Sequence, residues 1–302
     1  MPENLYNLID ANKRKTALFI IVTSLFLGAL GYIIIRVANW GITGYVFFGI
    51  FIVLYNLILY YNSDKIALSS TGSVLADPEE FKSLHNIVEE VCIASGVPKP
   101  KVYIMPSPAP NAFATGRNPK NASIAVTTGL LEMMNREELQ GVVAHEISHV
   151  RNYDILLQTV VAVIGGLTIL LRDFFLRYSF GGGRKTGARR SGGQVGLILI
   201  VIGLVMAIIA PLFVALIRAA ISRQREYLAD ASGAYITRYP KGLAQALAKL
   251  RDNHQPLYRA SQSNAHLFIA NPFGKDRADI SSFLATHPPI DKRIDRLNSL
   301  YI

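Results

Sequence analysis

The sequence predicts a mainly α-helical membrane protein that carries a small α+β domain. The first observation is composition: hydrophobic residues make up 51% of the chain and charged residues 17%, with a mean hydropathy of +0.29. These values are too apolar for an ordinary soluble domain of 302 residues. The second is the placement of charge, because four long apolar runs alternate with segments of mixed composition. We therefore expect four hydrophobic helices beside a domain assembled from separate segments.

The first two apolar runs predict an N-terminal transmembrane hairpin. Residues 16–35 are nearly uncharged, and about 20 apolar residues suffice to cross the hydrocarbon core. The basic cluster 13–15 precedes this run and, by the positive-inside rule, stays in the cytoplasm. A short uncharged loop leads to the second run, residues 44–60. We assign residues 1–61 to this hairpin, which returns the chain to the cytoplasmic side.

Residues 62–154 form the first part of the expected globular domain. The spacing of apolar residues predicts a helix over 78–94, with Cys92 on its buried stripe. Two short β-rich segments, 101–105 and 123–127, predict strands. The segment NAFATG lies between the two strands.

A helix with a polar start carries the most informative residues. Asn135 is a good N-cap, and Glu138 three residues later completes a capping box. The helix then presents His145, Glu146 and His149 in a His-Glu-x-x-His pattern. Histidines at positions i and i+4 share one helical face and can bind one zinc ion. Zinc lowers the pKa of bound water to near 7, and the glutamate can act as general base.

The third and fourth apolar runs, 155–171 and 195–217, predict a second hydrophobic hairpin. The loop between them, 172–194, is rich in glycine and strongly basic. If both runs cross fully, this basic loop faces outward against the positive-inside rule. Either the rule is overridden or the hairpin is only partly inserted. The loop is a candidate contact for anionic lipid headgroups, with a solvated linker as the alternative.

Residues 218–302 complete the domain and supply a candidate third zinc ligand. Glu226 and Asp230 lie four residues apart on one helical face of RQREYLAD. In a zincin-like domain with a glutamate ligand, Glu226 binds zinc and Asp230 accepts a hydrogen bond from a ligand histidine, most plausibly His145. The alternative is an ordinary charged helix, in which both acids pair with neighbouring arginines. An antiparallel second hairpin brings the two ligand-bearing helices together at one membrane face.

Five short segments spread over nearly the whole chain match one family pattern. They are NAFATG at 111–116, IAVTTGLL at 124–131, AHEISHVRNYD at 144–154, SRQREYLAD at 222–230 and THPPIDKRI at 286–294. Together with the N-terminal hairpin, this set resembles the HtpX family of membrane zinc peptidases. The CAAX prenyl proteases share the zinc motif but carry more membrane helices than this chain supplies.

The resemblance implies a zinc metalloendopeptidase of the cell membrane that clears misfolded or damaged membrane proteins, with its active site facing the cytoplasm. It implies one Zn²⁺ per subunit, bound by His145, His149 and Glu226, with Glu146 catalytic. Three residues, Asn111, Ala112 and Phe113, resemble an edge strand that pairs with the substrate backbone, as suits unfolded substrates.

The resemblance also assigns a role to the C-terminal motif. His287 and Arg293 are expected to approach the active site and stabilise the anionic tetrahedral intermediate. The alternative is that Pro288 and Pro289 shape a turn and that His287 is structural.

Two other classes of protein are compatible with parts of this sequence. The net charge of +10 and pI of about 9.7 are compatible with a nucleic-acid binder. No nucleic-acid-binding motif accompanies the basic residues, so nucleic acid is not expected as a partner. A non-catalytic membrane scaffold with structural zinc is the other alternative, but such a site has no use for Glu146.

Overall fold

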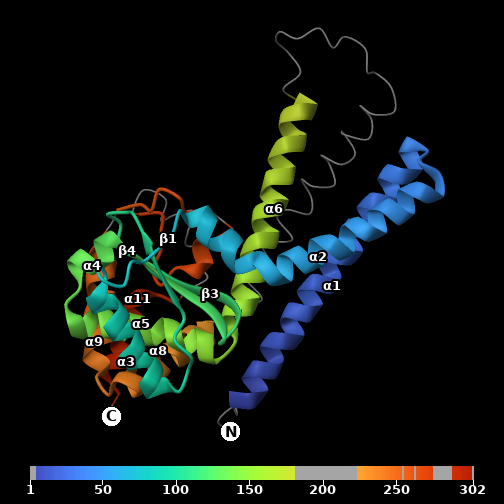
Figure 1. Ribbon diagram of the computed structural model, residues 1–302. Coiled ribbons are helices and arrows are strands. Elements are labelled where there is room, and N and C mark those ends of the chain that lie inside the picture. Colours follow the sequence, from blue (N-terminus) through green and yellow to red (C-terminus); the bar gives the residue numbers. More distant parts are fainter. Residues whose placement is uncertain (1–4, 181–222, 254, 262, 275–287, 301–302) are drawn as a thin grey trace.

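Three long helices extend from a body that is built around a four-stranded sheet (Figure 1). They are α1 (Leu5–Ala38), α2 (Gly41–Thr71) and α6 (Asp154–Phe180). The computed structural model describes residues 5–180, 223–253, 255–261, 263–274 and 288–300. The fourth apolar run, most of the basic loop and His287 lie outside the described residues.

The predicted N-terminal hairpin is present as two continuous helices. In the described part of the chain, Asp10–Arg36 and Gly41–Thr71 are long and apolar enough to cross a membrane. Only 11% of the apolar window in α2 is buried, so its hydrophobic side chains need another apolar surrounding. The helix continues to Thr71, past the boundary that we placed at residue 61, and its last turns contact the globular body.

Helix α6 is longer than the third apolar run suggested. The run of 155–171 is marginal for crossing, but α6 comprises 27 residues, which corresponds to about 40 Å. Residues 172–180, which we expected in a flexible basic loop, are the last turns of this helix.

The sheet contains the two predicted strands and places them side by side. Its order is β1 (Val74–Leu75), β2 (Lys101–Met105), β4 (Asn121–Thr127) and β3 (Ala112–Asn118). Strands β2 and β4 are parallel, whereas β1 and β3 run antiparallel to their neighbours. Strand β3 lies at one edge, with a register shift between Gly116 and Asn118 before the hairpin to β4. A Cβ atom at Gly116 would collide with the carbonyl oxygen of Asn121.

One face of the sheet is covered by the helices of the globular body. These are α3 (Lys82–Ser95), α4 (Thr128–Met133), α5 (Arg136–Arg151), α8 (Arg223–Thr237), α9 (Pro240–Asp252) and α11 (Ile290–Asn298). Strand residues Val102, Ile104, Ile124 and Val126 face this core. Cys92 is buried in it, as predicted.

Helix α3 begins at Lys82 rather than at Pro78, because the preceding residues form a turn. The carboxylate of Asp77 accepts hydrogen bonds from the backbone N–H groups of Glu79 and Glu80. This local bonding offers the backbone an alternative to the first helical turn.

The opposite face of the sheet packs against the long helices. Alternate strand residues, such as Met105, Phe113 and Ala125, share a cluster with Leu68 at the end of α2 and Ala162 of α6. The 3₁₀ helix η1 (Ala265–Leu267) closes this cluster. The alternation of side chains along each strand thus joins the membrane helices to the globular body through one sheet.

Candidate active site

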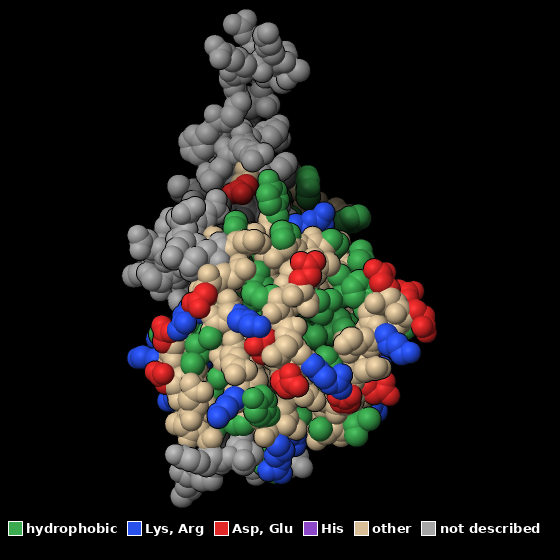
Figure 2. Space-filling model, turned by 90° about the vertical axis from the view of Figure 1, so that its left-hand side faces the viewer, with side chains coloured by type: hydrophobic (Ala, Val, Ile, Leu, Met, Phe, Trp, Pro, Cys, Tyr) green, Lys and Arg blue, Asp and Glu red, His purple; other side chains and the backbone are tan. Residues whose placement is uncertain are grey.

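Helix α5 begins where the sequence predicts and is buried along most of its length. The Asn135 side chain accepts from the Glu138 backbone N–H at 2.9 Å, and Glu138 Oε2 accepts from the Asn135 N–H at 2.9 Å. This capping box satisfies two donors at the helix start. Apolar residues around the His-Glu-x-x-His pattern, including Val143 and Ile147, are fully buried. The helix thus carries its histidines inside the protein, and no histidine is visible on the face in Figure 2.

A glycine lets helix α8 lie close against α5. A Cβ atom at Gly233 would lie 3.0 Å from the backbone nitrogen of His145 and 3.2 Å from the carbonyl carbon of Ala144. These are tighter than ordinary van der Waals contacts, so the close approach depends on the missing side chain. It brings Glu226, in the first turn of α8, to the histidine face of α5.

Two imidazole rings and one carboxylate converge at this contact. The Nε2 atoms of His145 and His149 lie 3.2 Å apart. Carboxylate oxygens of Glu226 lie 3.7 Å from His145 Nε2 and 3.5 Å from His149 Nε2. One ligand atom of each residue falls within 4.8 Å of the others, and all three side chains are buried. Two imidazole nitrogens and a carboxylate oxygen form a donor set typical of catalytic zinc sites.

Asp230 contacts the first histidine and is itself held by an arginine. Its Oδ1 lies 2.9 Å from His145 Nδ1, as the sequence predicts. The Arg293 guanidinium from α11 binds both carboxylate oxygens, at 2.8 and 2.7 Å. Arg293 Nη1 also donates to the carbonyl oxygen of Ile269 at 3.0 Å. Burial alone would raise the pKa of Asp230, but the charge and hydrogen bonds of Arg293 outweigh it and lower the pKa to about 2.

The second histidine has a carboxylate partner that the sequence analysis did not single out. Asp154 Oδ2 lies 3.1 Å from His149 Nδ1. The other oxygen of Asp154 accepts from Arg225 Nη1 at 3.1 Å and from the Nδ2 of Asn12 in α1 at 2.6 Å. The buried Asn12 also donates to the carbonyl oxygen of Asn152 at 3.0 Å. A polar side chain of the first membrane helix therefore lies two contacts from His149, a candidate metal ligand.

The orientation of the two rings suits a cation between them. Because Nδ1 of each ring faces a carboxylate, Nδ1 is the nitrogen that would carry the ring proton with a metal ion bound, and both Nε2 atoms, 3.2 Å apart, would then be free to bind the ion. Burial lowers the pKa of His145 to about 4, so its ring is neutral. Burial opposes a charge on His149 as well, but Asp154 and Glu226 outweigh it and raise that pKa to about 9. The surroundings thus favour one positive charge at this point, which a metal ion would supply.

Glu146 lies beside the ligand set but makes different contacts. Its side chain is buried and accepts a hydrogen bond from the backbone N–H of Ala114 in β3. Burial raises the pKa of Glu146 to about 7, since removal from water disfavours the carboxylate. A carboxyl group that titrates near neutral pH can take up and release a proton during a reaction.

The expected substrate strand is at an edge of the sheet, although part of that edge already has a partner. The Ile269 N–H donates to the Ala112 carbonyl oxygen at 3.0 Å, and Asn111 Nδ2 donates to the Ala270 carbonyl oxygen at 3.1 Å. Phe113 is fully buried on the other face of the sheet. Pairing of a substrate with Asn111–Phe113 stays a prediction, and at Ala112 it requires the 269–270 segment to move.

The two C-terminal residues have different outcomes. His287 lies outside the described residues. Arg293 does reach the site, but its shortest contacts are to Asp230 and Ile269, with Glu226 Oε2 at 3.9 Å from Nη1. This geometry favours a role through Asp230 over direct contact with an intermediate.

Such a site, on a body joined to helices of membrane length, defines a membrane zinc metalloprotease. The chain belongs to peptidase family M48, because its residues 78–301 match the model described as Peptidase family M48. A protein of Caldanaerobacter subterraneus named Protease HtpX homolog is 61% identical over 301 residues, which cover 99% of this chain and 98% of that protein. A protein of Pyrococcus abyssi with the same name is 46% identical over 291 residues, 95% of each chain.

A solved structure shares the fold. The crystal structure of S. mikatae Ste24p matches with a TM-score of 0.50 and 17% sequence identity, and the match covers 94% of this chain and 67% of that one. At this identity the likeness concerns the fold alone.

Proposed function

We propose that this membrane metalloprotease is a zinc-dependent endopeptidase that cleaves misfolded or damaged membrane proteins. The observation that carries the proposal is the convergence of His145, His149 and Glu226 with Glu146 adjacent on the same helix. A purely structural zinc site would be closed by a fourth protein ligand. In the described part of the chain, the group consists of three ligands, which leaves room for a catalytic water.

The chain's own residues would hold one zinc ion per subunit in a fixed geometry. His145 and His149 supply Nε2, and Glu226 supplies a carboxylate oxygen. Asp230 and Asp154 fix the two rings through Nδ1. When bound, zinc supplies a Lewis acid that lowers the pKa of a water ligand and polarises the scissile carbonyl group.

Glu146 would move the proton in the reaction. It takes the proton of the attacking water and later delivers it to the leaving amine nitrogen. The Ala114 N–H holds its carboxylate against β3. Peptide substrate bound along β3 then lies next to the proton acceptor.

The substrate strand and the C-terminal motif extend the proposal. An extended peptide pairs with the backbone of β3 from Asn111 to Phe113, which reads main chain rather than side chains and suits unfolded proteins. His287 contacts the anionic intermediate. Arg293 positions His145 through the bidentate contact with Asp230.

The test compares cleavage of an unfolded model protein by wild type, Glu146→Gln and the matched control Glu132→Gln, whose side chain is exposed. Zinc content is measured for each sample. We expect hydrolysis only by wild type and control, with loss of hydrolysis in a chelator. If Glu146→Gln cleaves as fast as wild type at equal zinc content, the proposed mechanism is wrong. If none of the three cleaves while zinc is bound, a structural zinc scaffold is the better explanation.

We further propose that the chain is a multi-pass protein of the cell membrane with this site in the cytoplasm. The basic cluster 13–15 before the apolar part of α1 supports that orientation. Basic residues of 172–194 are proposed to contact anionic headgroups. Protease added to sealed right-side-out vesicles should leave the globular body intact. Cleavage within the globular body would show that it faces outward, which contradicts the proposed orientation.

A further inference from the structure

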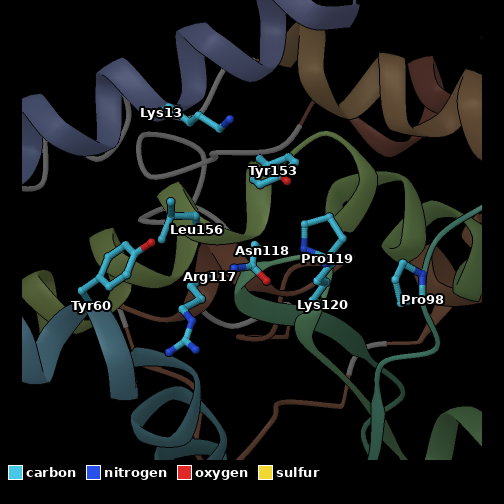
Figure 3. A pocket seen from close by; sticks show the side chains of 9 residues that line it. All are labelled: Lys13, Tyr60, Pro98, Arg117, Asn118, Pro119, Lys120, Tyr153 and Leu156. Atoms are coloured by element: carbon cyan, nitrogen blue, oxygen red, sulfur yellow. The ribbon is translucent and has the colours of Figure 1, made fainter.

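A pocket of about 390 Å³ lies between the membrane helices and the β3–β4 hairpin (Figure 3). In Figure 3, Lys13 of α1 lies at the top of the pocket and Tyr60 of α2 at its left, with Arg117 and Lys120 of the hairpin below. Tyr153, which precedes α6, and Leu156 in the first turn of α6 lie between Lys13 and the hairpin residues. The pocket is separate from the candidate active site, since none of the site residues that the structure describes lines it.

The position of the pocket corresponds to the edge of a membrane. Lys13 precedes the apolar run of α1, Tyr60 ends that of α2, and Leu156 lies in the first turn of α6. All three helices therefore contribute the end that adjoins the globular body. Lysine and tyrosine at such ends are typical of the headgroup region.

The charge of the pocket has one sign. The described residues that line it include the cations Lys13, Arg117 and Lys120 and no carboxylate. None of these three cations forms an ion pair with a carboxylate of the described residues. By contrast, Lys99, the residue after Pro98 of the pocket lining, pairs with Glu89 at 2.8 Å. Lys13 and Arg117 instead face the rings of Tyr153 and Tyr61, each at 4.9 Å. Three cations held around one cavity without counter-charges favour an anionic ligand.

We propose that this pocket binds the phosphate headgroup of an anionic phospholipid. Its volume is in the range of small-ligand sites, which accommodates a headgroup. The apolar surfaces of α1 and α2 continue from the pocket and would contact the acyl chains. Each basic residue near a membrane surface strengthens binding to anionic lipid, and three act together here.

Site-specific labelling provides the test. The single natural cysteine, Cys92, is buried and gives a low background, so a cysteine introduced at the exposed Pro98 in the pocket lining reports occupancy. Pro98→Cys is reconstituted in vesicles of phosphatidylcholine alone or with about one quarter phosphatidylglycerol. We expect maleimide labelling to be at least about tenfold slower with phosphatidylglycerol. The control Pro106→Cys, also at an exposed proline, should label equally in both.

Two triple variants then separate the pocket from general charge. In the Pro98→Cys chain, replacement of Lys13, Arg117 and Lys120 by Gln should abolish the protection. Replacement of the exposed Lys82, Lys101 and Lys241 by Gln removes the same charge from the globular body and should preserve it. Equal protection in both triple variants would overturn the proposal.

Two further arms complete the experiment. Millimolar inorganic phosphate added to phosphatidylcholine vesicles should not protect Pro98→Cys, and protection equal to that by phosphatidylglycerol would overturn the lipid assignment. If the pocket variant exposes Cys92 to labelling, its fold is lost, and the single variant Lys120→Gln at the exposed hairpin replaces it with the same expectation. The readout is independent of peptide hydrolysis, so failure here and failure of the proposed protease mechanism are distinguishable.

Discussion

Replacement of Asp154 by Asn tests whether the carboxylate behind His149 supports metal binding. The shape is kept, and an amide oxygen can still accept from His149 Nδ1, but the charge-assisted contacts with His149 and Arg225 are weakened. Loss of such an outer contact weakens metal affinity about 10–100-fold, or ~1.4–2.7 kcal/mol. Zinc affinity is measured by competition with a chromophoric chelator, and hydrolysis is followed as a function of free zinc. We expect activity to fall at limiting zinc and to recover within a few-fold at saturation.

The control for this experiment is Asp295→Asn, which removes an exposed carboxylate from α11. Thermal denaturation of both variants without zinc separates an effect on the fold from one on the metal. If Asp154→Asn binds zinc as tightly as wild type, the contact with His149 does not support the metal, and the reasoning from geometry fails. Alanine is avoided at this position, because it would leave the buried Asn12 without its shortest hydrogen-bond acceptor.

Three other predictions follow from the packing. Arg293→Lys keeps the charge but loses the bidentate contact with Asp230. The rate of hydrolysis at limiting zinc should therefore fall about tenfold. A rate equal to that of the wild type would contradict a positioning role for Arg293. Gly233→Ala should lower the melting temperature, because the cost of overpacking against α5, about 1–3 kcal/mol, exceeds the ~1 kcal/mol gain in helix propensity. The neighbouring control Ser232→Ala should not lower the melting temperature. Burial raises the pKa of Cys92 from 9.0 to about 11, so at pH 8 its thiolate fraction is about 100-fold below that of an ordinary thiol. Cys92 should therefore react with a thiol reagent much more slowly in the folded protein than in the unfolded chain. Equal rates in the two states would show that the cysteine is accessible.

The candidate ligand residues could be singled out in the sequence because their spacing is helical. His145 and His149, like Glu226 and Asp230, lie four residues apart, and an α-helix places such pairs on one face. The capping box of α5 and the two strands of the parallel pair are equally local features, and the structure confirms them. The helical pairs, the capping box and each strand's existence follow from residues within a single element, whereas the pairing of the elements does not.

The contacts between elements were not predictable in the same way. Asp154 lies only five residues after His149, but it reaches the ring because Tyr153 adopts a left-handed conformation, with φ of 59°, between α5 and α6. Asn12 arrives from 142 residues away in the sequence. No periodic pattern relates such residues, although the segment AHEISHVRNYD includes Asp154 and could have drawn attention to it. The pairing of Ile269 with Ala112 likewise has no local signal.

The contact between α1 and the candidate metal site limits how this protein can be shortened. A soluble fragment that begins after the first hairpin would remove Asn12 from Asp154 and leave a buried carboxylate with one partner fewer. If the fragment began after the end of α2, it would also lack Ala67 and Leu68, which pack on the face of the sheet that contacts the long helices. The hydrolytic unit and its anchor are therefore not separable modules, and a bilayer or a detergent that mimics one is part of the native environment in which the enzyme should be assayed.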